Sequence, residues 1–212
     1  MYQILGIKRA LSYFALVCLA VALGWIYCIP PEGLAGVWRI GTSTVAGLGT
    51  VVALFGQTAI FPCICRLPFI RNWFPPIDGK WRAELHSNWS TIQQRGSAGA
   101  AAQPLAPLTA SVTIIARLFY IRMNLTSENR YSVSKTVFVR ASRDDEDGSV
   151  MLHYLYRNTT KLPLVTDSDC HDGAANLTVE RDGKNIWMDG VYWTNRNWHQ
   201  GLNTAGTIVL RR

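Results

Sequence analysis

Residues of the types that catalyse reactions are spread thinly along this chain. The only dense cluster is the run 169–172, which reads Asp-Cys-His-Asp. A nucleophile and its base usually come from separate elements that the fold brings within hydrogen-bond reach, so Cys170 beside His171 is a poor arrangement for a hydrolase. The chain also lacks a phosphate-binding glycine loop, an HExxH motif and paired CxxC motifs. We therefore predict no catalytic residues, no enzyme activity and no bound metal or cofactor.

Aromatic and basic side chains are instead interleaved along segments rich in β-forming residues. Aromatic faces stack on nucleobases, and guanidinium groups pair with phosphates, so this pattern would suit a small nucleotide with one or two phosphates. Ordinary strands also favour aromatic residues, and arginine is common on the outside of a barrel, so the pattern alone leaves both interpretations open. The candidates on these grounds are Arg117, Arg140, Tyr154, Tyr156, Tyr192 and Arg196.

From residue 78 onward the chain consists of short β-type runs separated by turn residues. Asp182-Gly183, for example, indicates a hairpin between two such runs. Seven or eight antiparallel runs must close or stack to hide their edges, and about eight strands make a barrel wide enough for one small ligand. The opening Gly79-Lys80-Trp81, with a basic residue in the last strand, resembles the plugged end of lipocalin-type barrels. We therefore predict an all-β domain, an antiparallel barrel of about eight strands.

Two uncharged apolar runs precede this domain, at residues 10–29 and 40–65. A helix needs about 20 apolar residues to cross the hydrocarbon core of a bilayer, so both runs predict membrane-spanning helices, joined by a turn at 30–39. A cleaved signal peptide is the competing interpretation of the first run. The predicted organisation is a two-helix transmembrane hairpin at 1–66, a connector at 67–77 and a β-barrel at 78–212.

The distribution of charge predicts the topology of the hairpin. Lys8 and Arg9 precede the first helix, Arg66 and Arg71 follow the second, and the turn holds one Arg and one Glu. By the positive-inside rule, both ends of the hairpin lie in the cytoplasm. The net charge is +7, but residues 72–212 hold 16 basic and 13 acidic residues and are only mildly basic. We therefore expect a small anionic ligand rather than DNA or RNA.

Small residues recur along one face of the second helix. Thr42, Ala46, Gly49, Ala53 and Gly56 follow one another at spacings of 4, 3, 4 and 3 residues. In lipid such a small-residue face lets helix backbones approach closely and drives helix association. The face either packs the two helices of one hairpin or assembles protomers, and both roles remain open.

These features together resemble a known family. Two N-terminal spans, a proline-rich connector, the Gly79-Lys80-Trp81 opening and the closing runs Asp189–Arg196 and Thr204–Leu210 are similar to the two-transmembrane, β-strand-rich effectors of bacterial CBASS anti-phage systems. The resemblance covers the whole chain in architecture, whereas the sequence motifs are short and lie in the first and last predicted strands.

The resemblance implies a function. In that family a nucleotidyltransferase senses phage and makes a cyclic dinucleotide, which the effector's barrel binds. The effector then oligomerises in the bacterial inner membrane and breaches it, which kills the infected cell. For this chain it implies ligand contacts within the matching ending, at Tyr192, Thr194, Asn195 and Arg196. The alternative is a membrane-anchored, lipocalin-like sensor of a lipid or another small apolar ligand.

Overall fold

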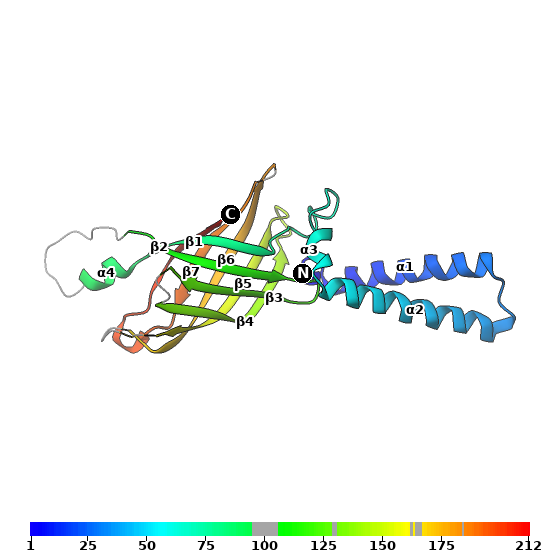
Figure 1. Cartoon of the computed structure of the whole chain (residues 1–212), viewed down its shortest axis with the longest axis horizontal. Helices are drawn as coiled ribbons and strands as arrows, with labels where there is room; N and C mark the ends of the chain where they lie inside the picture. Colours follow the sequence, from blue (N-terminus) through cyan, green and yellow to red (C-terminus); the bar gives the residue numbers. More distant parts are fainter. Residues whose placement is uncertain (95–105, 129–130, 162, 164–166, 184) are drawn as a thin grey trace. The chain divides into compact units, whose positions relative to one another are not determined.

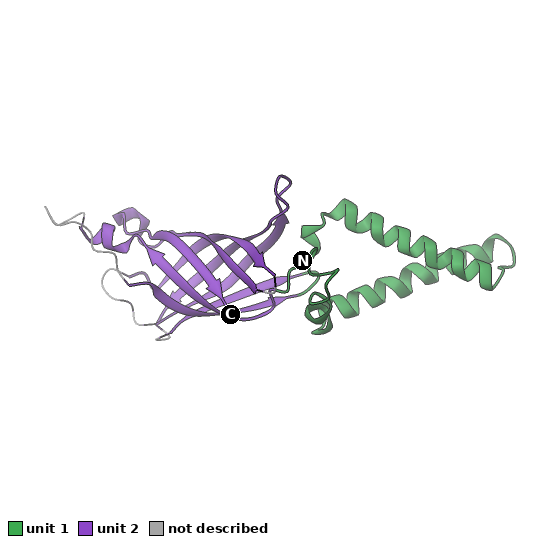
Figure 2. Cartoon of the chain, turned by 90° about the horizontal axis from the view of Figure 1, so that it is seen from above, with its two compact units in different colours: residues 1–76, 117–119 green, residues 77–116, 120–212 purple. Residues whose placement is uncertain are grey.

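A computed structural model describes residues 1–94, 106–128, 131–161, 163, 167–183 and 185–212 of the chain (Figure 1). The chain divides into two compact units (Figure 2). The first comprises residues 1–76 and 117–119, and the second comprises residues 77–116 and 120–212. The first unit is helical and the second is a β-barrel.

Two long helices dominate the first unit. Helix α1 spans Ile7–Cys28 and helix α2 spans Gly33–Gln57, and both are long and apolar enough to cross a membrane. Most of their side chains are exposed, which suits helices whose solvent is lipid. The connection between them is shorter than the predicted 30–39, because α2 begins at Gly33, two residues after Pro31. A proline cannot donate to a preceding helical carbonyl, so Pro30 and Pro31 end α1 but do not delay α2.

The other parts of the first unit are short. A 3-10 helix spans Tyr2–Ile4 and helix α3 spans Ile60–Ile64. The turn 117–119 belongs here as well. The amide of Leu118 donates to the carbonyl of Gly56 at 2.8 Å, and the Leu118 carbonyl accepts from the Tyr2 amide at 2.8 Å. The side chain of Leu118 lies against Gly56, so a methyl group on Gly56 would come within 2.8 Å of it.

The predicted small-residue face of α2 is therefore used in two ways. Gly56 is buried against Leu118, and Gly49 is half-buried, with Phe14 of α1 as the nearest side chain. Thr42, Ala46 and Ala53 are exposed. The hydroxyl of Thr42 bonds back to the carbonyls of Trp38 and Arg39, so its polar group is satisfied within the helix. One part of the face packs within the chain, and the other is available to a neighbour.

The second unit is a closed barrel of eight strands in sequence order, each antiparallel to its neighbours (Figure 1). The sequence-based expectation of a barrel rather than a sandwich is confirmed. The β-forming residues of segment 108–126 predict either one bent strand or two, and the structure forms two. The strands are β1 (Gly79–Ser87), β2 (Leu108–Ala116), β3 (Ile121–Ser127), β4 (Ser132–Arg143), β5 (Val150–Thr160), β6 (Cys170–Asp182), β7 (Asn185–Thr194) and β8 (Ala205–Arg211).

Two local features were missed by sequence reasoning. Alternating apolar and polar residues predict that the first strand runs from Gly79 to Ser90, but β1 ends at Ser87 and a short helix, α4, spans Trp89–Gln94. The Ser87 hydroxyl accepts from the Trp89 amide and starts this turn, but six residues are too few to show helical periodicity. The composition of residues 160–172 predicts a loop, but strand β6 begins within this segment, at Cys170. Pairing of Cys170 with Thr159 on β5 extends the strand, and such pairing cannot be read from local composition.

One end of the barrel is plugged around Trp81, as its sequence context predicted. The Trp81 indole donates to the carbonyl of Ile77 at 2.8 Å. The Arg212 guanidinium lies 4.3 Å from the centre of the indole ring and also donates to the carbonyl of Asp78 at 2.6 Å. The Asp78 carboxylate in turn accepts from the Ala116 amide at 2.9 Å. This cation–π and hydrogen-bond cluster joins the first strand, the second strand and the residue that follows β8.

Close approach between β6 and β7 requires glycine at position 190. Gly190 faces Leu177, and a methyl group there would lie 1.9 Å from the backbone carbonyl oxygen of Asn176. Because the clash is with backbone, the strands must separate to relieve it. Overpacked sites typically lose about 1–3 kcal/mol of stability. We expect Gly190→Ala to lower the free energy of unfolding by about 3 kcal/mol or more, at the upper end of that range.

Thermal or chemical denaturation of the full chain in detergent, followed by tryptophan fluorescence, measures this effect. Val191→Thr is the matched control, because its side chain is exposed on the same strand and retains β-branching. Equal stability of the Gly190→Ala variant and the parent would contradict the close approach of the two strands.

Candidate functional site

The barrel encloses a cavity of about 520 Å³ to which all eight strands contribute. This lies within the roughly 300–1,000 Å³ of small-molecule sites. Its lining follows the strand alternation: on β5, Tyr154, Tyr156 and Asn158 are buried, whereas Leu155 and Arg157 are exposed. The alternation thus decides which candidate side chains can reach a ligand.

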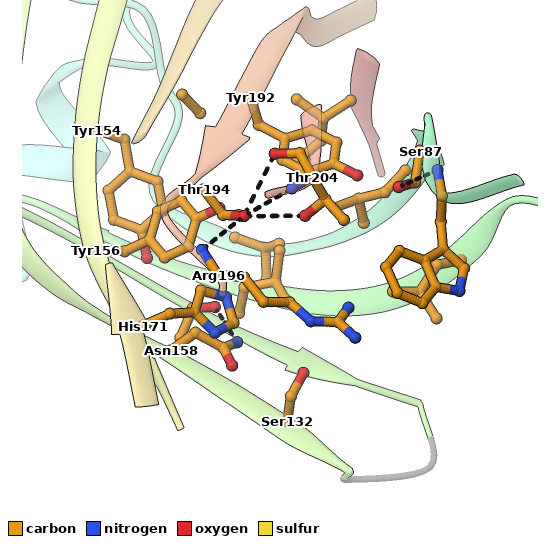
Figure 3. Close-up of a pocket in the computed structure, with 18 of the residues that line it drawn as sticks. Ser87, Ser132, Tyr154, Tyr156, Asn158, His171, Tyr192, Thr194, Arg196 and Thr204 are labelled. Atoms are coloured by element: carbon orange, nitrogen blue, oxygen red, sulfur yellow. Dashed lines mark hydrogen bonds between the residues drawn. The ribbon is translucent and has the colours of Figure 1, made fainter. Parts of the chain in front are cut away.

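The cavity is apolar toward the plugged end and polar toward the other, where β5 and β7 end. The deeper walls carry Val112, Met123, Leu177 and Leu210. The polar end carries Ser132, Ser134, Asn158, Thr160, Thr194 and Thr204, several of them visible in Figure 3. A ligand that fits both ends needs a flat or apolar part and several hydrogen-bonding groups.

Three tyrosines form the aromatic part of the wall. The rings of Tyr154 and Tyr156 lie 5.0 Å apart between centroids, and the Tyr154 hydroxyl donates to the Met123 carbonyl at 2.7 Å. The Tyr156 ring lies directly on Gly173 of β6, where a methyl group would come within 2.3 Å of it. Burial raises the pKa of Tyr154, Tyr156 and Tyr192, so all three remain protonated at neutral pH. They offer neutral hydroxyl groups and aromatic faces.

Among the described residues that line the cavity, Arg196 is the cationic side chain, and it lies at the polar end. Its guanidinium lies 4.4 Å from the centre of the Trp89 ring, a cation–π distance. It also forms an ion pair with Asp167, which accepts a hydrogen bond from the Tyr131 hydroxyl as well. The exposed fractions of the Arg196 and Asp167 side chains are 17% and 11%, so this charge pair is shielded from solvent. A guanidinium held in this way can bind a phosphate that displaces the Asp167 carboxylate.

Two predicted residues beside Arg196 have different surroundings. Thr194 is buried in the cavity wall, where its hydroxyl lies 3.0 Å from that of Thr204 and accepts from the Thr204 amide at 3.2 Å (Figure 3). The Asn195 side chain is directed elsewhere and accepts from the backbone amide of Asp172 at 2.8 Å. It borders a separate outer pocket, together with Arg157 and Cys170.

The structure brings five of the eight predicted ligand-binding residues together. Tyr154, Tyr156, Tyr192, Thr194 and Arg196 all line the cavity. Of the others, Asn195 lies at the outer pocket, as described. Arg140 is exposed on β4 between buried Val139 and Ala141, because adjacent residues of a strand face opposite sides. Arg117 lies in the turn 117–119, which belongs to the first unit.

Several cavity residues escaped sequence reasoning. Asn158 follows Tyr154 and Tyr156 at the same parity of β5, and extending the alternation by two residues would have found it. Trp89 and Asp167 left no comparable signal, because the first lies in a short helix and the second in a segment between strands. They reach the site only through tertiary folding.

The Asp-Cys-His-Asp run does not form a catalytic arrangement of neighbours. Cys170 is exposed, whereas His171 is half-buried and lines the cavity. Burial and the nearby charge of Arg196 lower the pKa of His171, while Asp172 and Asp167 oppose this shift. His171 is therefore neutral at pH 7, with its Nδ1 atom 3.3 Å from the Ser168 hydroxyl.

The lowered pKa of His171 makes the barrel sensitive to acid. Because the unfolded chain binds a proton on His171 more readily, this residue removes stability as the pH falls below its ordinary pKa of 6.5. We expect the melting temperature of the parent to fall more steeply between pH 6.5 and 5 than that of His171→Gln. Parallel pH profiles of the two proteins, measured by thermal denaturation, would contradict the buried neutral imidazole. His86→Gln is the matched control, because His86 is exposed on β1.

Comparison with known proteins identifies the family to which this barrel belongs. Residues 73–212 match the family model described as Cap15, cyclic dinucleotide receptor domain. A similar protein is CD-NTase-associated protein 15 of Escherichia albertii, which is 37% identical over 149 residues, 69% of this chain and 67% of that protein. The resemblance inferred from the sequence motifs is confirmed. The chain therefore belongs to the Cap15 family, and its eight-stranded barrel is the cyclic dinucleotide receptor domain of that family.

Proposed function

We propose that this chain is a membrane effector of anti-phage defence. A cyclic dinucleotide, made by a functionally linked nucleotidyltransferase, binds inside the barrel. Binding then triggers self-association in the bacterial inner membrane, which breaches the membrane and kills the infected cell. Both ends of the two-helix hairpin face the cytoplasm in this proposal, since Lys8, Arg9, Arg66 and Arg71 flank its helices. The barrel acts as a receptor and not as an enzyme.

The observation that carries the proposal is the shielded guanidinium of Arg196 at the polar end of an aromatic cavity. A cyclic dinucleotide presents two anionic phosphodiesters and two flat bases. Arg196 supplies a charged partner for a phosphate, and Tyr156 and Tyr192 supply faces or hydroxyl groups for the bases. The cavity volume of about 520 Å³ and the family of the domain support the same ligand class.

The first test removes this guanidinium. Arg196→Ala is expected to weaken binding of the preferred cyclic dinucleotide about 10- to 100-fold, because a hydrogen-bonded charge contributes about 1.5–3 kcal/mol. Calorimetry on the full chain in detergent micelles, with a panel of cyclic dinucleotides, measures the change.

Arg157→Ala is the matched control for this test. Arg157 lies on β5 next to buried Tyr156 and Asn158, but it is exposed and pairs with Asp172 on the outside of the barrel. The Arg157→Ala substitution removes the same charge as Arg196→Ala but does not change the cavity. The affinity of this variant for the cyclic dinucleotide should therefore stay within about two-fold of the parent. Equal losses in both variants would indicate a general electrostatic effect, and binding of no cyclic dinucleotide by the parent would refute the receptor function.

Self-association is proposed through the exposed part of the small-residue face. Thr42 and Ala46 line a concave patch on α2 with Val45, Trp38 and Gly41. All of these residues except the half-buried Gly41 are exposed. A concave apolar surface with small residues at its centre lets a second helix pack closely in lipid. Gly49 and Gly56 contribute to self-association only indirectly, because they pack against side chains of the same chain.

Ala46→Leu tests this step. We expect this variant to bind the cyclic dinucleotide like the parent and to lose most ligand-induced oligomerisation and dye leakage from liposomes, because a larger side chain fills the concave patch. Val51→Leu is the matched control, because Val51 is exposed on another side of α2. Unchanged leakage from the Ala46→Leu variant would show that this face is not the assembly surface.

The apolar deep wall supports one alternative, a membrane-anchored sensor of a lipid. Met123, Leu177 and Leu210 would contact an acyl chain without using Arg196. Mass spectrometry of the purified chain separates the two functions. Bound fatty acid that cyclic dinucleotides cannot displace would favour the lipid sensor, and displacement or absence of lipid would favour the nucleotide receptor.

A further inference from the structure

Asn158 presents an unsatisfied hydrogen-bond acceptor to the cavity. Its side chain is only 7% exposed and lines the cavity from β5. The amide nitrogen donates to the Ser134 hydroxyl at 2.9 Å. The amide oxygen has no hydrogen-bond partner among the described residues. Buried polar atoms without a partner are rare in native proteins and cost folding stability, so a partner from outside the chain is expected.

The position of Asn158 is set by the strand register. It lies opposite Ser134 on β4 and opposite His171 on β6, which makes one row across three strands. Asn158, His171 and Arg196 all line the polar part of the cavity, and all three are labelled in Figure 3. Tyr156 precedes it by two residues toward the apolar end, and Thr160 follows by two toward the strand end. The amide therefore stands between the aromatic wall and the polar end.

The chemistry of the unpartnered atom selects the ligand group that can satisfy it. An amide oxygen accepts hydrogen bonds, so an anionic phosphate oxygen cannot be its partner. Each of the four bases carries at least one N–H group on its Watson–Crick edge, and proteins read exposed bases by hydrogen bonds to that edge. The adjacent Tyr156 ring gives the base a surface on which to stack. Arg196 remains as the partner for a phosphate.

We infer that Asn158 is a specificity-determining residue that accepts a hydrogen bond from an N–H group of one base of the cyclic dinucleotide. This inference rests on the proposed receptor function and adds the orientation of the bound ligand in the cavity. One base enters between Tyr156 and His171, and a phosphate stays near Arg196. Ser134 positions the Asn158 amide by holding its nitrogen.

A cycle of protein and ligand changes tests the contact directly. The full chain in detergent and its Asn158→Leu variant are titrated by calorimetry with the tightest-binding cyclic dinucleotide. Both proteins are then titrated with analogues in which one base has lost an N–H donor group, either an amino group or a ring N–H. The replacements are purine for adenine, hypoxanthine or 2-aminopurine for guanine, 2-pyrimidinone for cytosine and N3-methyluracil for uracil. Asn124→Leu, at an exposed position of β3, is the matched control.

We expect Asn158→Leu to weaken binding of the parent ligand about 10-fold or more, as loss of a buried hydrogen bond does. With one of the analogues the two proteins should bind within about three-fold of each other, because the removed N–H and Asn158 form one interaction and their losses do not add. Asn124→Leu should bind every ligand like the parent. In the single variant the Ser134 hydroxyl loses the hydrogen bond from Asn158, which can destabilise the barrel. If it does, the double variant Asn158→Leu with Ser134→Ala should be stable and should reproduce the loss of affinity.

Three results would overturn the inference. Unchanged affinity of the folded Asn158→Leu variant for the parent ligand would show that the amide contacts nothing in the ligand. The losses of binding free energy from Asn158→Leu and from the ligand change could instead be additive for every base analogue and non-additive for an analogue that lacks a ribose 2′-hydroxyl. That result would place the amide on a ribose hydroxyl. If the parent chain binds no cyclic dinucleotide at all, the receptor function fails first, and this outcome is distinct from the other two.

Discussion

The structure of the receptor domain depends on the ladder that joins β1 to β8. Pairing of Ala83 with Leu210, and of the residues around them, turns a meander of eight strands into a closed barrel. Closure gives every strand a neighbour on both sides and directs every second side chain into a shared interior. The cluster of Trp81, Arg212 and Asp78 fills one end of that interior, so its remaining space forms a cavity toward the other end.

The contents of the cavity follow from the costs of burial. Apolar side chains such as Met123 and Leu177 are favourable there without partners, whereas each polar group needs one. Thr194 and Thr204 satisfy one another, and the Tyr154 hydroxyl uses the Met123 carbonyl. Arg196 is neutralised by Asp167 and covered by Trp89. The amide oxygen of Asn158, by contrast, has no hydrogen-bond partner among the residues that the structure describes.

The helical unit shows how one pattern of small residues can serve two purposes. Gly56 lies close against Leu118, and Gly49 is half-buried with Phe14 as its nearest side chain, so this part of the face packs within the chain. Thr42, Ala46 and Ala53 are exposed on a helix long and apolar enough to cross a membrane. A lipid environment provides no hydrophobic force to cover them, so close packing against another helix is the interaction available to them.

The sequence alone determined the two long apolar helices, the all-β character of the second unit and the family to which the chain belongs. Uncharged runs of 20 or more residues predict membrane helices whatever their partners, and alternating strands with turn residues predict a closed β-domain. The short motifs around Gly79-Lys80-Trp81 and the last two strands were sufficient for the family resemblance, which the match over residues 73–212 confirms. These are local or repetitive signals that need no knowledge of distant contacts.

Tertiary structure alone decided which candidate residues share a site. Alternation makes Tyr154 and Tyr156 neighbours inside the barrel and places Arg140 outside, but a one-residue change of register would exchange the two faces. Asp167 and Trp89 come from parts of the chain that are 78 residues apart and meet at Arg196 only after the barrel closes. The unsatisfied oxygen of Asn158 is a property of the whole surroundings, because it depends on every group that could have bonded to it and does not.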